Sequence, residues 1–124
     1  MSSESYHEPI DLLSETTKDM HRAIVSLREE LDAVDWYGQR AEACNDAELR
    51  AVLLHNRDEE IEHAMMVLEW LRRHDPAISS NIDRYLHAQG PIVALEHEMK
   101  DGTEAARVSP SAASLGIGSL KGTK

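Results

Sequence analysis

Apolar residues recur at intervals of three and four positions through most of the first hundred residues. The clearest run is spaced 4, 3, 4 and 3: Met20, Ile24, Leu27, Leu31 and Val34. This is the spacing of one face of an α-helix, and it predicts a helix from about residue 9 or 10 to about residue 43. Gly38 weakens such a helix without ending it, and the polar sequence at 44–46 ends it.

A second apolar stripe predicts another long helix, from about residue 46 to about residue 73. Its members are Leu49, Leu53, Ile61, Ala64, Val67, Leu68 and Leu71. Asn45 and Glu48 have the spacing of a capping box at its start, and Pro76 lies just beyond its end. Shorter helices are expected within 78–87 and within 92–99.

Two long helices joined by a turn of two or three residues form an antiparallel hairpin. A single hairpin is too small to bury an apolar face on each side and remain stable alone. The predicted fold class is therefore all-α: an antiparallel two-helix hairpin that dimerises into a four-helix bundle and is followed by short helices.

The composition changes near residue 101. Four of the six glycines lie in the last 24 residues, among Ser, Ala and Pro. We expect a helical domain at 1–100 and a disordered tail at 101–124. Leu115, Ile117 and Leu120 form an apolar cluster within about 115–122, the kind of motif that docks into a groove on a partner.

The charge and cysteine content exclude several classes of protein. With 13 Lys and Arg against 23 Asp and Glu, the net charge of −10 argues against nucleic-acid binding and favours attraction of cations. The single cysteine, Cys44, excludes an intramolecular disulfide, a cysteine zinc site and an iron–sulfur cluster. No apolar run approaches the roughly 20 residues of a membrane span, and no signal peptide is visible, so we expect a cytoplasmic protein.

Glu60 lies in the middle of the second apolar stripe on a helical wheel, and His63 lies about 60° from it. A carboxylate within such a stripe needs a cation or a proton to compensate its charge. Glu-x-x-His is also the pair by which helices of di-iron bundles present two ligands to one metal.

Glu30 occupies the matching position on the first helix. It lies 14 residues before Cys44, and Glu60 lies 14 residues after Asp46, so both are about 21 Å from the turn. One chain then supplies two carboxylates and one imidazole. Two chains supply four carboxylates and two imidazoles. This is the ligand set of ferritin-like bundles, and it suits iron or manganese.

Other residues near these positions have two interpretations each. Tyr37 shares the face of Glu30 and either donates a hydrogen bond to a ligand carboxylate or packs in the core. Glu29, Asp32 and Trp36 form an outer stripe, which is either a weak cation site or an ordinary acidic surface with Trp36 at an oligomer contact.

Three stretches together resemble the encapsulated ferritins, the ferritin-like cargo of encapsulin nanocompartments: HRAIVSLREELDAVDWY, HNRDEEIEHAMMVLEWLRR and LGIGSLKG. The resemblance implies a half-ferritin whose chains pair to build a ferroxidase centre and assemble into a ring-shaped homodecamer. It implies that Glu30, Glu60 and His63 bind two iron ions and that Tyr37 supports them. Fe2+ would be oxidised to Fe3+ by O2, for storage of iron inside the encapsulin shell.

The resemblance extends to two further sites. Glu29, Asp32 and Trp36 correspond to an outer site of metal uptake, and we expect other members of the family to have a glutamate where this chain has the shorter Asp32. The tail, at about 115–122, corresponds to a targeting peptide that docks the protein to the shell's inner wall. The protein would then be located within an encapsulin nanocompartment in the cytoplasm.

Two other classes of function are compatible with a helical bundle. One is a di-metal protein that binds O2, such as a haemerythrin-like carrier, but this needs a histidine-rich ligand set and only His63 lies on the core face. The other is an acidic helical scaffold without metal.

Overall fold

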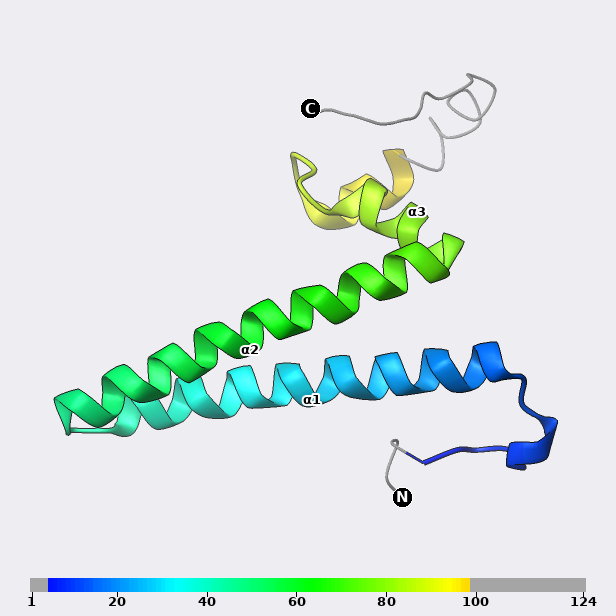
Figure 1. Ribbon diagram of the computed structural model, residues 1–124. Helices are drawn as coiled ribbons and strands as arrows, with labels where there is room; N and C mark the ends of the chain where they lie inside the picture. The colour runs from blue at the N-terminus through cyan, green and yellow to red at the C-terminus, as the bar shows by residue number, and fades with distance from the viewer. Residues whose placement is uncertain (1–4, 99–124) are drawn as a thin grey trace. The chain divides into compact units, whose positions relative to one another are not determined.

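The computed structural model describes residues 5–98, and this part of the chain contains helices and no strands (Figure 1). A 3₁₀ turn, η1 (Ile10–Leu12), precedes α1 (Glu15–Ala43), α2 (Ala47–His74) and α3 (Pro76–Tyr85). Residues 92–98 are also helical. The all-α prediction is confirmed. The predicted tail at 101–124, with its targeting peptide at about 115–122, lies outside the described residues.

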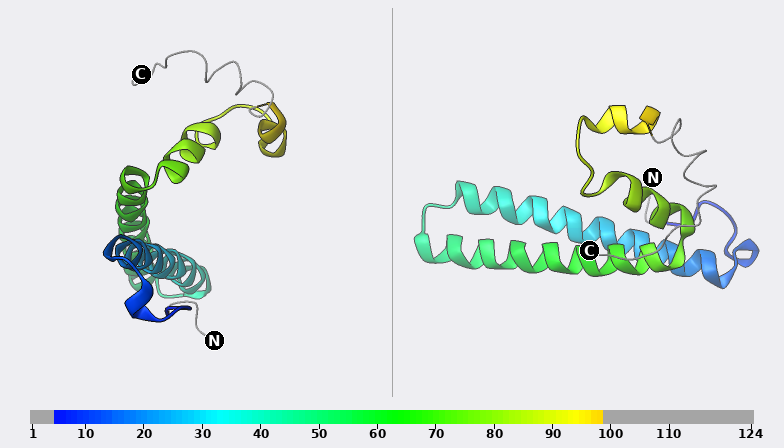
Figure 2. Two further views of the ribbon diagram at one scale, coloured as in Figure 1. Left: turned by 90° about the vertical axis from the view of Figure 1, so that its right-hand side faces the viewer. Right: turned by 90° about the horizontal axis from the view of Figure 1, so that it is seen from above.

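Helices α1 and α2 lie side by side and antiparallel, joined at 44–46 (Figures 1 and 2). This is the hairpin that the two apolar stripes predict. The turn is stabilised by Arg50, whose Nε lies 3.1 Å from the carbonyl oxygens of both Ala41 and Cys44. Arg50 thus adds a donor to the Ala41 carbonyl, which also accepts from the Cys44 amide, and supplies one to the Cys44 carbonyl just beyond the end of α1. The sequence pattern gives no indication of this role for Arg50.

The first helix begins later than predicted. Its N-cap is Ser14, whose hydroxyl oxygen accepts a hydrogen bond from the Thr17 amide at 3.1 Å. Ser14 has an extended backbone, so the helical turn at η1 is separate from α1. The predicted start at residue 9 or 10 is therefore wrong, because a good N-cap ends the preceding segment. The predicted end, at residue 43, is correct.

The second helix starts from a different cap than the predicted one. The carboxylate of Asp46, rather than the side chain of Asn45, accepts a hydrogen bond from the Leu49 amide at 2.8 Å. The helix then ends at His74, within one residue of the prediction. Asp75 begins α3 by accepting from the amides of Ala77 at 2.9 Å and Ile78 at 3.2 Å.

The chain divides into two compact units, one ending at Ser79 and the other starting at Ser80. In the first unit, the buried apolar side chains among the described residues are those of Ala41, Ala64 and Leu71. In the second unit, Leu95 is the buried apolar residue of the described part. None of the described helices combines the length and apolarity of a membrane span.

Several members of the predicted core stripe are exposed in the single chain. Leu49 keeps 50% of its surface and Ile61 keeps 36%. A hairpin has only one contact line between its helices, so it covers the residues on that line and leaves their neighbours open. Apolar surface therefore remains uncovered on both sides of the line.

Candidate metal centre

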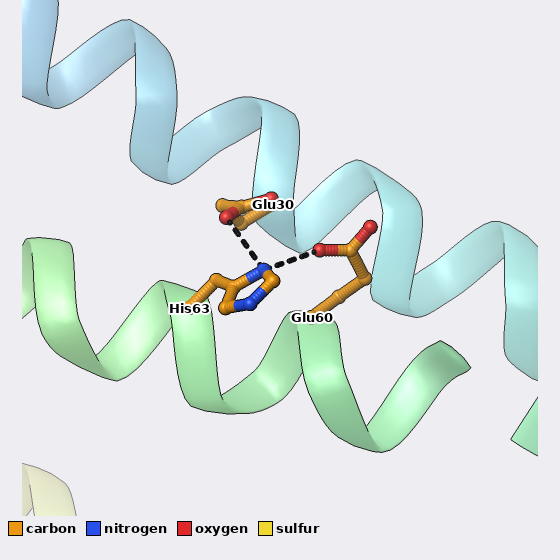
Figure 3. Close-up of side chains that lie close together, drawn as sticks. All are labelled: Glu30, Glu60 and His63. Atoms are coloured by element: carbon orange, nitrogen blue, oxygen red, sulfur yellow. Dashed lines mark hydrogen bonds and ion pairs between the residues drawn. The ribbon is translucent and has the colours of Figure 1, made fainter. Parts of the chain in front are cut away.

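Three side chains with metal-binding groups meet between α1 and α2 (Figure 3). Glu30 comes from α1, and Glu60 and His63 come from α2. The His63 Nδ1 lies 3.0 Å from Glu60 Oε1 and 3.4 Å from Glu30 Oε2. One ligand atom from each residue lies within 4.8 Å of the other two.

The convergence follows from local helix geometry and the close approach of the two helices. Glu60 and His63 are three residues apart, so they project from one face of α2. Glu30 lies opposite them because the two carboxylates are equally far from the turn. Ala64, beside His63, is completely buried, and its small side chain lets α1 and α2 approach closely.

The centre is only partly enclosed by the single chain. The side chains of Glu30 and Glu60 retain 25% and 24% of their surface, and that of His63 retains 45%. Two oxygens and one nitrogen suit iron or manganese, so the donor set fits such an ion. Three residues cannot complete its coordination, and the open side at His63 leaves room for ligands from outside the chain.

The group holds protons more strongly than isolated side chains would. Burial is the main cause that raises the pKa of Glu30, and a hydrogen bond and charge repulsion with Glu60 raise it further. The hydrogen bond to Glu60 raises the pKa of His63, against the opposing effect of partial burial. Glu30 and His63 therefore keep their protons to higher pH in the metal-free group than they would as isolated side chains.

Metal binding is expected to weaken as the pH falls, because a cation must displace these protons. Since the pKa of His63 lies above its usual 6.5, the loss should begin above that pH. We expect Mn2+, which is stable in air, to bind at least about fourfold more weakly at pH 6 than at pH 8. Calorimetric titration at the two pH values measures this. Equal affinities would contradict the proposed proton competition.

Tyr37 does not reach Glu30 in the single chain: among the described residues, no hydrogen bond joins them. The guanidinium carbon of Arg40 lies 5.5 Å from the centre of the Tyr37 ring. Support of a ligand carboxylate by Tyr37 therefore stays a prediction.

The residues of the outer stripe lie on the exposed surface of α1. Glu29 and Asp32 are exposed, and Trp36 keeps 52% of its surface. Within residues 5–98, the group of three metal-binding residues contains neither Glu29 nor Asp32. The outer cation site also stays a prediction.

Comparisons with known proteins all indicate the same family. Residues 5–89 match the family described as EncFtn-like. An encapsulated ferritin-like protein of Rhodospirillum rubrum is 53% identical, over 98% of this chain and 91% of its own. The encapsulin nanocompartment cargo protein EncC of Myxococcus xanthus is 30% identical, over 86% of this chain and 88% of its own. A crystal structure of a Nitrosomonas europaea protein is 60% identical, with a TM-score of 0.69, over 71% of this chain and 97% of its own.

Proposed function

The chain belongs to the EncFtn-like family of ferritin-like proteins, and on that premise we propose that it is a ferroxidase. Its substrates are Fe2+ and O2, and its site is a di-iron centre completed by a second copy of the chain. The observation that carries this proposal is the meeting of Glu30, Glu60 and His63 within 4.8 Å.

The half-site needs a second copy because iron takes more ligands than one chain supplies. Two half-sites around a two-fold axis provide four carboxylates and two imidazoles for two ions. The open side at His63 is where the second half-site would join the first. Each Fe2+ would then give up one electron, and O2 would take up the pair together with two protons and leave as hydrogen peroxide.

The carboxylates favour this oxidation by stabilising its Fe3+ product. Negative charge close to the ion stabilises Fe3+ more than Fe2+, because the attraction grows with the charge of the cation. Glu30, whose pKa is raised, would give up any proton it holds when Fe2+ binds, and His63 would present its Nδ1. Tyr37 is proposed to hold a ligand carboxylate in place in the assembled centre.

The acidic surface is proposed to feed the centre. A net charge of −10 raises the local concentration of Fe2+, and Glu29, Asp32 and Trp36 are proposed as an outer station for its uptake.

The protein is also proposed to be the cargo of an encapsulin shell in the cytoplasm. Two relatives carry the words encapsulated and encapsulin nanocompartment cargo in their names, and the chain matches both over most of its length. We propose that residues 115–122 bind the shell, that the chains form a ring-shaped homodecamer, and that Fe3+ is stored inside the shell.

Metal analysis of protein purified without added iron, followed by Fe2+ titration in air, tests the proposed activity. A ferroxidase consumes O2 in proportion to the Fe2+ added and releases Fe3+. A carrier would bind O2 reversibly without releasing Fe3+, and a scaffold would bind no Fe2+ at the Glu30 and His63 positions. Either of these results would reject the proposal.

Activity is expected to require the paired form. A monomer holds three ligands and should oxidise Fe2+ no faster than buffer does, and Fe2+ should promote pairing because a bound ligand stabilises the state that binds it. Sedimentation with and without Fe2+, run beside an oxidation assay across a dilution series, measures both effects. A monomer with full activity would rule this out.

A further inference from the structure

An open groove lies between α1 and α2 near the metal centre, and we name it the Met66 groove. Its volume is about 390 Å³, and its lining is mostly apolar. The residues that line it are Asp19, Arg22, Ala23, Ser26, Met66, Val67 and Trp70.

The Met66 groove begins one helical turn from the metal centre. On α2, Met66 follows His63 by three residues, which is a rise of about 4.5 Å. On α1, Ser26 precedes Glu30 by four residues, which is a rise of about 6 Å. Because the helices are antiparallel, both steps lead away from the turn at 44–46. A small molecule that leaves the centre in this direction therefore passes the groove.

Met66 also lies on the side of the hairpin where the centre is open. His63 and Met66 lie about 60° and 120° from Glu60 in the same sense of rotation around α2. Met65 lies about 140° from Glu60 in the opposite sense. Neighbouring methionines therefore project from two different sides of α2.

The two methionines differ in position but little in exposure. Met66 keeps 60% of its surface and Met65 keeps 49%, and of the two only Met66 lines the groove. An oxidant dissolved in the solvent would reach both sulfur atoms at similar rates. An oxidant formed at the metal centre would reach Met66 first. Met65 is therefore an internal reference for Met66.

The sulfur of Met66 has the chemistry to react with such an oxidant. Among the side chains that line the groove, this thioether is the group that hydrogen peroxide oxidises directly. The sulfur attacks one peroxide oxygen, so an S–O bond forms while the O–O bond breaks. The other oxygen leaves with both hydrogens as water. Sulfur loses two electrons and the peroxide gains them, so the reaction needs no third reactant.

We propose that Met66 reacts with the hydrogen peroxide that forms at the metal centre and becomes methionine sulfoxide before the peroxide leaves the protein. The peroxide comes from the proposed ferroxidase activity, on which this inference rests. Its removal protects Trp70, which lines the same groove with its ring stacked on His74 at 3.9 Å between centres. Enzymatic reduction of the sulfoxide would restore the site.

Peptide mass spectrometry after aerobic Fe2+ oxidation by the full chain, with catalase present, tests the proposal. Catalase destroys the peroxide that reaches the solvent, so it protects Met65 but does not act on peroxide inside the groove. Sulfoxide should be at least about fivefold more abundant at Met66 than at Met65. Hydrogen peroxide added to the iron-free protein without catalase should oxidise the two within about twofold of each other, because their exposures are similar.

A matched pair of variants measures the peroxide itself. Met66→Leu keeps the apolar bulk and removes the thioether, and Met65→Leu makes the same change outside the groove. In the first turnover without catalase, Met66→Leu should release more hydrogen peroxide per Fe3+ formed than wild type does. Met65→Leu should release as much as wild type.

Four results would overturn the proposal. Equal or absent oxidation of Met66 and Met65 while Fe3+ forms would do so and leave the ferroxidase activity intact. Preference for Met66 in the iron-free protein would do so, because its own reactivity would be the cause. Oxidation of Trp70 to the same extent as Met66 would indicate hydroxyl radicals instead of peroxide. If no Fe3+ forms, the ferroxidase activity is rejected together with this source of peroxide, and the absorbance of Fe3+ in the same reaction identifies that case.

Discussion

Glu60→Ala is expected to reduce the rate of Fe2+ oxidation to that of buffer alone, a loss of at least about 100-fold. In a centre built from two half-sites, the one substitution removes two carboxylates. It also removes the group that lies 3.0 Å from the His63 ring nitrogen and that raises the pKa of His63. Stopped-flow absorbance of Fe3+ and O2 consumption under air measure the loss.

Glu30→Ala and His63→Ala should have the same effect, since each removes two ligands from the paired site. Glu62→Ala is the matched control, because Glu62 is an exposed carboxylate two residues from Glu60 on a different side of α2. The metal-free fold should be as stable as wild type or more so, because Glu60 and Glu30 repel each other in the pair. A wild-type rate in Glu60→Ala would reject the assignment of the centre.

Deleting the residues after Arg107 is expected to abolish co-purification with a co-expressed encapsulin shell. The deleted segment contains Leu115, Ile117 and Leu120, and burial of such side chains contributes roughly 1.5–3 kcal/mol each. Losing three of them removes most of the free energy of a short docking contact. Helicity, assembly and Fe2+ oxidation should be unchanged, because the hairpin and Glu30, Glu60 and His63 are retained.

Leu120→Asp in the full chain should cause most of the same loss, because it places a charge in the apolar contact. Ser119→Asp is the matched control for added charge, since serine contributes no apolar surface to the motif. Affinity purification through the shell protein, with quantification of co-eluting cargo, measures both variants. Normal packaging of the truncated chain, or its unfolding, would show that the segment is not a docking peptide.

The two long helices were predictable because helix periodicity is a local property. A stripe of apolar residues every three or four positions appears in the sequence whatever the partner of that stripe is. The ends were less predictable: Ser14 and Asp46 became the N-caps, while the pattern favoured a start near residue 9 and a cap at Asn45. Several nearby residues can cap a helix, and the geometry of the connecting backbone selects among them.

The candidate centre was predictable for a related reason. The rise of an α-helix is constant, so counting residues from the turn places Glu30 and Glu60 at the same level, and the structure brings them together with His63. Counting residues from the turn does not predict which atoms of Glu30, Glu60 and His63 lie next to each other. Only the structure shows that the Nδ1 of His63 faces both carboxylates, at 3.0 Å from Glu60 and 3.4 Å from Glu30.

By itself, the sequence determined the hairpin, its turn and the level of the three ligand-type residues, because each of these depends on regular spacing along one chain. Only the tertiary structure decided which apolar residues are covered. Leu71 is buried, while Leu31 and Ile61 remain exposed on the side away from His63, and a groove lies beside Gly38. Burial depends on what lies opposite a residue in space, and a single hairpin places a neighbour opposite only one line of each helix.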